Sequence, residues 1–334
     1  MKKLILLILL CACPALTFAH SGAYQWQFDL SAQQPGEEVQ LWVPYPASDA
    51  VQSISNIRWE GNYSSAAVYT DSTFGTQMLH VRWPKESKDR QLSFSFSAER
   101  SEQIRRDFPA QEGAYTPLDY ANYLSATSLG PIDGQVKELA DQITADKVGI
   151  LAKARAIYDW TVDNTYRDPE TRGCGLGDVT ALLRRPGGKC ADISSVYIAL
   201  ARAAGVPTRE ILGIRSGKSE QQDVSTWQHC WAEFFLPSYG WVPVDPADVR
   251  KAMLKQNLTL DDPRVAELRE AYWGRVDQYR VRLSEGRDLQ LNPPQQGPAV
   301  NYLMYPFAQV GGKTIDWLAP ESFKYSILWQ PAGE

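Results

Sequence analysis

Cys190 is the residue in this sequence whose position best suits covalent chemistry. It directly follows Gly187-Gly188-Lys189 and directly precedes a segment, 191–204, in which apolar residues recur at helical spacing. A thiol at the start of a helix lies close to free backbone N–H groups and to the positive end of the helix dipole, and both stabilise a thiolate. We therefore expect Cys190 to be a nucleophile. The alternative is that it is a small buried hydrophobic residue.

His229 and Asp245 are placed to activate such a thiol. His229 lies in an alternating, strand-like segment, 226–234, and Asp245 follows the next such segment, 240–244. Because a tight turn makes these two strands an antiparallel hairpin, Asp245 can reach one nitrogen of His229 and leave the other facing Cys190. A nucleophile, a base and an orienting acid form a Cys-His-Asp triad. Taken singly, His229 is more typical of a core residue and Asp245 of a turn residue.

Few other residues compete for these roles. The chain of 334 residues has three histidines and five cysteines, and their spacing matches no zinc pattern, so we expect no metal and no cofactor. Its 34 Lys and Arg against 39 Asp and Glu give a net charge of -5, which argues against a nucleic-acid partner. We expect a peptide or protein substrate.

An acyl-transfer reaction also needs hydrogen-bond donors for the oxyanion that forms on the attacked carbonyl. We expect the backbone N–H of Cys190 to be the first donor. Tyr166 is our first choice for the second, with Trp160 and Gln228 as further candidates, although each also suits a packing or surface role. Three tryptophans flank the site and are candidate walls of a substrate cleft, namely Trp227, Trp231 and Trp241.

Cys174 and Cys230 remain once Cys190 is assigned. Cys174 lies in a glycine-rich loop, 173–188, and Cys230 points to the face of its strand opposite His229. We expect a Cys174–Cys230 disulfide that holds this loop beside the site. Disulfides form in the oxidising compartments to which exported proteins are delivered. The alternative, a Cys174–Cys190 bridge, would leave the resting protein inactive.

The elements that must position these residues divide the chain into three parts. Residues 20–118 hold short alternating strands separated by turn signals, which is typical of an antiparallel β-sandwich. Residues 119–250 form a core of helical and strand-like segments that carries the candidate triad. Residues 251–334 form a β-rich C-terminal extension that we expect to pack on this core. The predicted fold class is therefore α+β.

The N-terminus, residues 1–19, has the pattern of a signal peptide. Met1-Lys2-Lys3 is basic, residues 4–10 are apolar, and Thr17-Phe18-Ala19 offers small residues for cleavage after Ala19. The apolar run is far shorter than the roughly 20 residues of a transmembrane helix, so we expect no membrane span. A periplasmic or secreted location follows. The alternative is a lipoprotein anchored through Cys13.

Four sequence blocks resemble those of the bacterial transglutaminase-like cysteine enzymes, in the same order. They are Gly188-Lys189-Cys190-Ala191-Asp192, the stretch 199–209, His229-Cys230-Trp231-Ala232-Glu233, and the stretch 240–246. The resemblance covers residues 135–250. It implies a papain-like fold for this core, with Cys190, His229 and Asp245 as nucleophile, base and acid. No segment resembles the calcium loops of the animal enzymes, so calcium dependence is not implied.

Together these features predict an exported cysteine enzyme that attacks an amide through Cys190 and forms a thioester. The acyl group would then pass to water, in peptide hydrolysis or glutamine deamidation, or to an amine in transamidation. The sequence leaves these three outcomes open, and it leaves the oligomeric state open. The alternative function is a non-catalytic envelope module that binds a peptide or protein in the same cleft.

Overall fold

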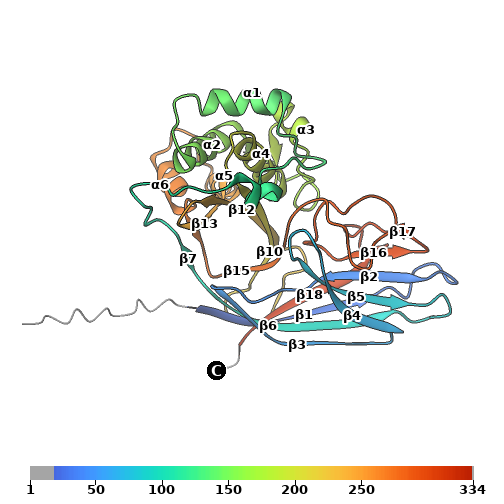
Figure 1. Ribbon diagram of the computed structural model, residues 1–334. Coiled ribbons are helices and arrows are strands. Elements are labelled where there is room, and N and C mark those ends of the chain that lie inside the picture. The colour runs from blue at the N-terminus through green and yellow to red at the C-terminus, as the bar shows by residue number, and fades with distance from the viewer. Residues whose placement is uncertain (1–18, 333–334) are drawn as a thin grey trace, which may run out of the picture.

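The computed structural model describes residues 19–332, which form two parts that lie side by side (Figure 1). In one part, helices α1 to α6 surround a four-stranded antiparallel sheet, and in the other two five-stranded sheets face each other. The predicted α+β class is confirmed. The signal-peptide and Cys13 predictions lie outside the described residues, apart from Ala19, the first residue of β1. No helix within residues 19–332 is both long and apolar enough to cross a membrane.

The β-sandwich forms because its strands alternate between buried and partly exposed residues. In β6 every second residue from Leu92 to Ala98 is buried, and these side chains share one core with those of β2 and β5. The strand order is β11-β18-β1-β6-β3 in one sheet and β17-β16-β2-β5-β4 in the other. The bounds are β1 (Ala19–Asp29), β2 (Val39–Pro44), β3 (Gln52–Gly61), β4 (Ser65–Thr70), β5 (Gln77–Trp83), β6 (Gln91–Ser101), β11 (Gln222–Asp223), β16 (Phe307–Val310), β17 (Lys313–Thr314) and β18 (Lys324–Pro331).

The C-terminal residues complete both sheets of the sandwich, whereas we expected residues 251–334 to pack on the core. Trp329 of β18 pairs with Tyr24 of β1, and Phe307 of β16 pairs with Trp42 of β2. Without these strands, β1 and β2 would each expose a row of unpaired backbone groups. Elsewhere in this stretch, α6 contributes Val265 to the helical core, and β15 pairs with β10 of the core sheet.

Helix α4 (Cys190–Ala203) is the centre of the core, and all 14 of its residues are buried. A helix that is buried on all sides must be surrounded by other elements, and α4 packs between the other helices and the sheet β13-β12-β10-β15. The helices are α1 (Gly134–Ile143), α2 (Ile150–Asn164), α3 (Val179–Arg184), α5 (Pro246–Gln256) and α6 (Pro263–Ala271), and the strands are β10 (Thr208–Arg215), β12 (Gln228–Leu236), β13 (Gly240–Val244) and β15 (Arg280–Glu285). Shorter elements are β7 (Gln103–Ile104), the 3-10 helix η1 (Pro117–Tyr123), β8 (Tyr166–Arg167), β9 (Gly187–Gly188) and β14 (Arg275–Val276).

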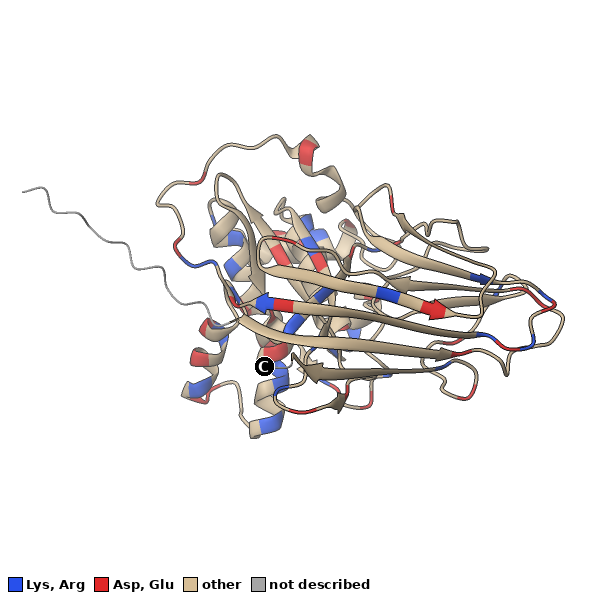
Figure 2. Cartoon of the chain, turned by 90° about the horizontal axis from the view of Figure 1, so that it is seen from below, with Lys and Arg blue, Asp and Glu red and all other residues tan. Residues whose placement is uncertain are grey.

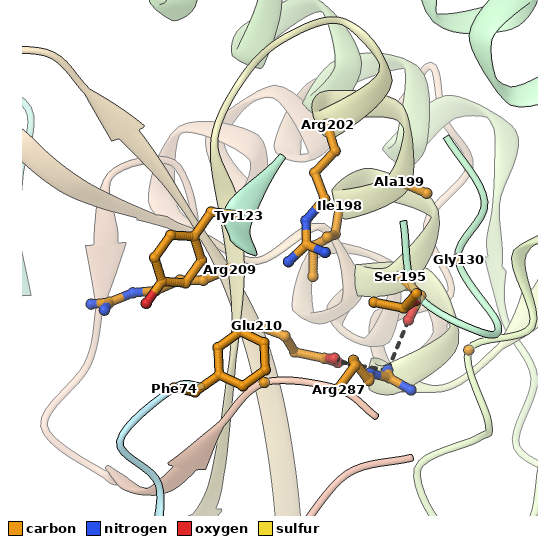
Figure 3. A pocket seen from close by; sticks show the side chains of 13 residues that line it. Phe74, Tyr123, Gly130, Ser195, Ile198, Ala199, Arg202, Arg209, Glu210 and Arg287 are labelled. Atoms are coloured by element: carbon orange, nitrogen blue, oxygen red, sulfur yellow. Dashed lines mark hydrogen bonds and ion pairs between the residues drawn. The ribbon is translucent and has the colours of Figure 1, made fainter. Parts of the chain in front are cut away.

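A buried ion-pair cluster joins α4 to the sheet (Figure 3). Arg287 donates hydrogen bonds to Ser195 of α4 at 2.8 Å and to Glu210 of β10 at 3.0 Å. The pocket between these groups measures about 20 Å³, which is room for about one water molecule. Because removing one partner of a buried ion pair costs about 3–5 kcal/mol, this cluster holds α4, and with it Cys190, against the sheet.

Candidate functional site

One cleft contains both the cysteine and the histidine that we predicted to react. It has a volume of about 830 Å³ and lies where α4, α5, β10 and β12 meet. Cavities of roughly 300–1,000 Å³ are typical of ligand sites. The residues that line it include Cys190, His229, Gln228, Trp227 and Asp248.

Asp192 and the glycine-rich loop hold Cys190 at the start of α4. The Asp192 carboxylate accepts hydrogen bonds from the backbone N–H groups of Gly177 at 2.8 Å and Lys189 at 3.1 Å. Gly175 has a φ of +90°, and a Cβ at this position would lie 1.9 Å from Asp192 Oδ2. A glycine is therefore required where the loop passes the helix. These contacts explain why an aspartate follows the cysteine at this spacing.

Three thiols meet at this end of α4. Hydrogen bonds with Cys174 and Cys230, followed by the hydrogen bond and charge of His229, hold the pKa of the Cys190 thiol well below its usual range, although burial opposes the shift. The hydrogen bond to Cys190 and burial raise the pKa of Cys174, and burial raises that of Cys230. Among the three thiols, the surroundings therefore favour the thiolate form at Cys190, and a thiolate is the nucleophilic form of cysteine.

Within residues 19–332 the cysteines are all free thiols, so the expected Cys174–Cys230 disulfide is not formed. The Cys174 Sγ donates to the backbone oxygen of Gln228 at 3.4 Å and accepts from the Tyr305 hydroxyl at 3.2 Å. Neither of these two contacts involves Cys230. A disulfide can form only where the two cysteine side chains point toward each other. The spacing of cysteines in the sequence does not give these side-chain directions.

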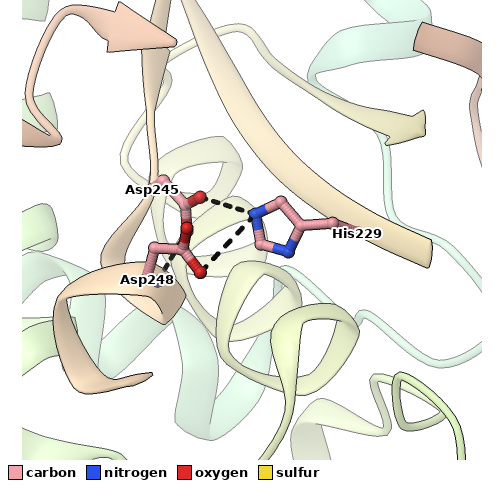
Figure 4. A group of neighbouring side chains, drawn as sticks. All are labelled: His229, Asp245 and Asp248. Atoms are coloured by element: carbon pink, nitrogen blue, oxygen red, sulfur yellow. Dashed lines mark hydrogen bonds and ion pairs between the residues drawn. The ribbon is translucent and has the colours of Figure 1, made fainter. Parts of the chain in front are cut away.

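His229 is held against two aspartates (Figure 4). Its Nε2 lies 2.7 Å from Asp245 Oδ2 and 3.8 Å from Asp248 Oδ1. The antiparallel pairing of β12 with β13 brings Asp245 back beside His229. Because Nε2 is engaged with these carboxylates, Nδ1 is the nitrogen left for the Cys190 thiol.

Asp245 has a second role as the N-cap of α5, since its Oδ1 accepts the backbone N–H of Asp248 at 2.8 Å. Arg280 of β15 bridges the two acids, donating to Asp245 Oδ2 at 2.6 Å and to Asp248 Oδ2 at 2.8 Å. Burial opposes ionisation of Asp248, but the charges of Arg215, His229 and Arg280 hold its pKa well below the usual range. Asp248 therefore remains a carboxylate beside the imidazole.

Sequence reasoning missed Asp248, Arg215 and Arg280. Asp248 lies one helical turn beyond Asp245 at the start of α5, so helical spacing is a signal that could have indicated it. Arg280 has no such local signal, because β15 reaches the site only through its pairing with β10.

His229, Asp245 and Asp248 offer ligand atoms that all lie within 4.8 Å of one another. Arg280 binds both carboxylates, and Arg215 binds Asp248 at 2.6 Å. A metal ion would have to compete with two guanidinium groups for the same oxygens. This donor set suits an ion-pair network that orients a histidine.

Of the three side chains proposed as oxyanion donors, the structure places Gln228 in the cleft. Its side-chain Nε2 and Oε1 are buried and have no hydrogen-bond partner in the described part of the chain. The backbone N–H of Cys190 also has no acceptor among these residues. Tyr166 and Trp160 do not line the cleft, because Tyr166 lies exposed against Gly187 and Trp160 packs on the helical core.

Of the three tryptophans expected to form the cleft wall, Trp227 lines it. Trp231 lies deeper along β12 in the core, where its Nε1 donates to Glu233 at 3.3 Å. Trp241 lies elsewhere, with its ring 4.3 Å from the Arg209 guanidinium. Trp231 and Trp241 are close to His229 in sequence but do not line the cleft. Each strand extends away from the site, so its successive residues lie farther from the cleft.

Comparison with known proteins gives three findings on sequence. Residues 137–246 match the family model of the transglutaminase-like superfamily. An uncharacterized protein of Haemophilus influenzae is 35% identical over an alignment of 369 positions that covers 98% of this chain and 99% of that protein. A protein-glutamine gamma-glutamyltransferase of Pseudomonas aeruginosa is 31% identical over 91 residues, which are 25% of this chain and 13% of that protein.

A solved structure shows the same fold. A chain from Cytophaga hutchinsonii, named as a candidate cysteine protease, matches 94% of this chain and 99% of its own length with a TM-score of 0.55 and 14% identity. At this identity the likeness concerns the fold alone. Together with the family match, it confirms the papain-like fold predicted for the core.

Proposed function

Because the chain belongs to the transglutaminase-like superfamily, we propose that it is a cysteine enzyme that attacks an amide carbonyl through Cys190. One observation carries the proposal. His229 lines the same cleft as Cys190, helps to lower the pKa of that thiol, and lies with its Nε2 2.7 Å from Asp245 Oδ2. This arrangement supplies a nucleophile, a general base and an orienting acid.

The first half of the reaction is acylation of Cys190. The thiolate attacks the carbonyl carbon, and the electron pair of the C=O bond moves to the oxygen. We assign the backbone N–H of Cys190 and the side-chain amide of Gln228 as donors to that oxyanion, because both residues line the cleft and neither group has an acceptor among the described residues. When the oxyanion collapses, the C–N bond breaks, and protonated His229 gives its proton to the leaving nitrogen. The products are a thioester on Cys190 and a free amine or ammonia.

The second half is deacylation. Neutral His229 removes a proton from the incoming nucleophile, which attacks the thioester and restores the Cys190 thiolate. Water gives peptide hydrolysis or glutamine deamidation, and an amine gives transamidation. We place this reaction on a peptide or protein substrate in the periplasm or outside the cell, in line with the signal-peptide pattern of residues 1–19.

Alkylation by a low dose of iodoacetamide, followed by peptide mapping, tests the activated thiol. Cys190 should react well below the usual thiol pKa of about 8.5 and lose reactivity only as the pH falls through its lowered value. Cys174 and Cys230 serve as internal controls, because their raised pKa values keep them protonated. An ordinary thiol pH profile at Cys190 would contradict the proposal.

A library of peptides that contain glutamine and lysine then identifies the reaction. Mass spectrometry of the products separates cleavage, deamidation and cross-linking in one measurement. All products should disappear in Cys190→Ala. Conversion that persists in this variant would show that the reaction does not proceed through Cys190.

A further inference from the structure

The cleft around Cys190 is lined by an unusual number of positive charges. Six cationic side chains and two carboxylates face it. The cations come from separate elements that meet only in the fold, namely Arg167 of β8, Lys189 before α4, Arg215 of β10, Lys218 beyond it, and Lys251 and Lys255 of α5.

The two carboxylates of the cleft already have partners. Asp248 binds Arg215 and Arg280, and Asp277 lies 3.2 Å from Arg280 Nε. Within residues 19–332, by contrast, the other five cations of the cleft form no ion pair with a carboxylate. We call this set the cleft cations, and it consists of Arg167, Lys189, Lys218, Lys251 and Lys255. Their charge is therefore available to a ligand.

The charges lie close enough to act on one another. Burial lowers the pKa of Lys251, and the positive charges of Arg215, Arg167 and Lys255 add to this effect, opposed only by Asp248. Lys251 and Lys255 are four residues apart on α5, so they share one face of the helix. Mutual repulsion at this spacing is relieved when an anion binds between the cations.

This concentration does not follow from the composition of the chain, whose net charge is -5. In Figure 2, positions of both signs are interspersed on the helices and turns, and the long strands of the facing sheet are largely uncharged. A cationic cleft in an acidic protein attracts anionic ligands by local placement of charge.

We propose that the substrate is an acidic peptide, whose carboxylates on either side of the reacting amide bind the cleft cations. This inference rests on the proposed function. The proposed chemistry at Cys190 requires an amide as the reacting group of the substrate. The cleft cations around Cys190 favour negatively charged residues next to that amide. Lys218 contributes at the cleft edge, where its ammonium lies 5.5 Å from the centre of the Tyr279 ring.

The potential at Cys190 is measurable without knowledge of the substrate. A negatively charged and a positively charged methanethiosulfonate each react with the thiolate, and peptide mapping gives the rate at Cys190 in each case. After correction for the rates with free cysteine, the anionic reagent should react at least about tenfold faster. The preference should weaken at high salt.

Paired variants assign this preference to the cleft cations. Lys251→Glu/Lys255→Glu should reduce the ratio of the anionic to the cationic reagent rate at least about threefold. Lys251→Gln/Lys255→Gln should give a ratio between those of the wild type and the glutamate variant. Lys85→Glu/Lys88→Glu makes the same charge change at exposed positions in the turn after β5 and should leave the ratio unchanged. A wild-type ratio near one, or an equal loss in both double variants, overturns the inference.

Peptides that share a central glutamine and differ only in flanking glutamate, alanine or lysine complete the test. The wild type should convert the glutamate peptide fastest, and Lys251→Glu/Lys255→Glu should remove that advantage. Equal conversion of all three overturns the charge inference and leaves the proposed function standing. If no peptide is converted while the reagent ratio still depends on Lys251 and Lys255, the anionic preference stands and the proposed amide chemistry fails.

Discussion

Replacement of Asp245 by asparagine separates the orienting role of this acid from its role in holding the helix. The carboxylate uses both oxygens at once. Oδ2 accepts from His229 at 2.7 Å and from Arg280 at 2.6 Å, and Oδ1 accepts from the backbone N–H of Asp248 at 2.8 Å. An asparagine has one acceptor oxygen and one donor group, so it cannot satisfy both sets of donors.

Either orientation of the asparagine has a defined cost. If its oxygen faces His229, the NH₂ group opposes the N–H of Asp248 and the cap of α5 is lost, at about 1 kcal/mol. If its oxygen caps the helix, the NH₂ group faces His229 and Arg280, which reverses the imidazole tautomer and leaves Nδ1 unable to accept a proton. In serine proteases the equivalent change lowers turnover about 10⁴-fold. We expect Asp245→Asn to lower amide turnover by about 10²–10⁴-fold, with a loss of stability of about 1–3 kcal/mol.

The assay measures the rate of Cys190 alkylation against pH, peptide turnover, and unfolding by urea. Asp262→Asn is the matched control, because Asp262 is the N-cap of α6 and accepts from the backbone N–H of Arg264 at 3.0 Å, away from the cleft. This control should retain wild-type turnover. Asp245→Asn with wild-type turnover and an unchanged alkylation profile would refute the reasoning.

Three further substitutions test the surroundings of the triad. Arg280→Gln leaves two buried carboxylates side by side and should destabilise the fold by about 3 kcal/mol, with partial rescue by Arg280→Lys; a loss of stability by urea unfolding below about 1 kcal/mol would contradict the bridging role. Gln228→Ala should lower kcat about 10²-fold and leave alkylation of Cys190 unchanged, whereas an unchanged kcat would remove Gln228 from the oxyanion site. Gly175→Ala would bring a Cβ to 1.9 Å from Asp192 Oδ2 and should slow Cys190 alkylation, while Gly36→Ala, also at positive φ but with open space around it, should not; equal effects on that rate would show that the loop contact does not position Cys190.

The parts of the site that could be predicted from the sequence are those with local signals. Cys190 begins a helix, His229 lies in an alternating strand, and a short hairpin returns Asp245 beside it. Each of these features is set by residues within a few positions of it. The helix and strand patterns therefore predicted the element on which each residue lies, and the hairpin predicted that Asp245 returns beside His229.

The parts that could not be predicted depend on contacts between distant segments. Arg280 arrives on a strand that pairs with β10, and β18 crosses to β1 at the other end of the chain. The Cys174 thiol makes its hydrogen bonds with Gln228 and Tyr305, which lie far from it in the sequence. Side-chain direction and long-range pairing are properties of the packed molecule, so spacing alone led to a disulfide that is not formed.

Trapping of the acyl-enzyme tests the central claim most directly. Protein incubated with the peptide library is quenched in acid and digested, and mass spectrometry locates the acyl group. We predict an adduct on the peptide that contains Cys190, removed by hydroxylamine as a thioester is, and absent from Cys190→Ala. Peptide conversion with no adduct at Cys190, or with the adduct on Cys174 or Cys230 instead, would contradict it.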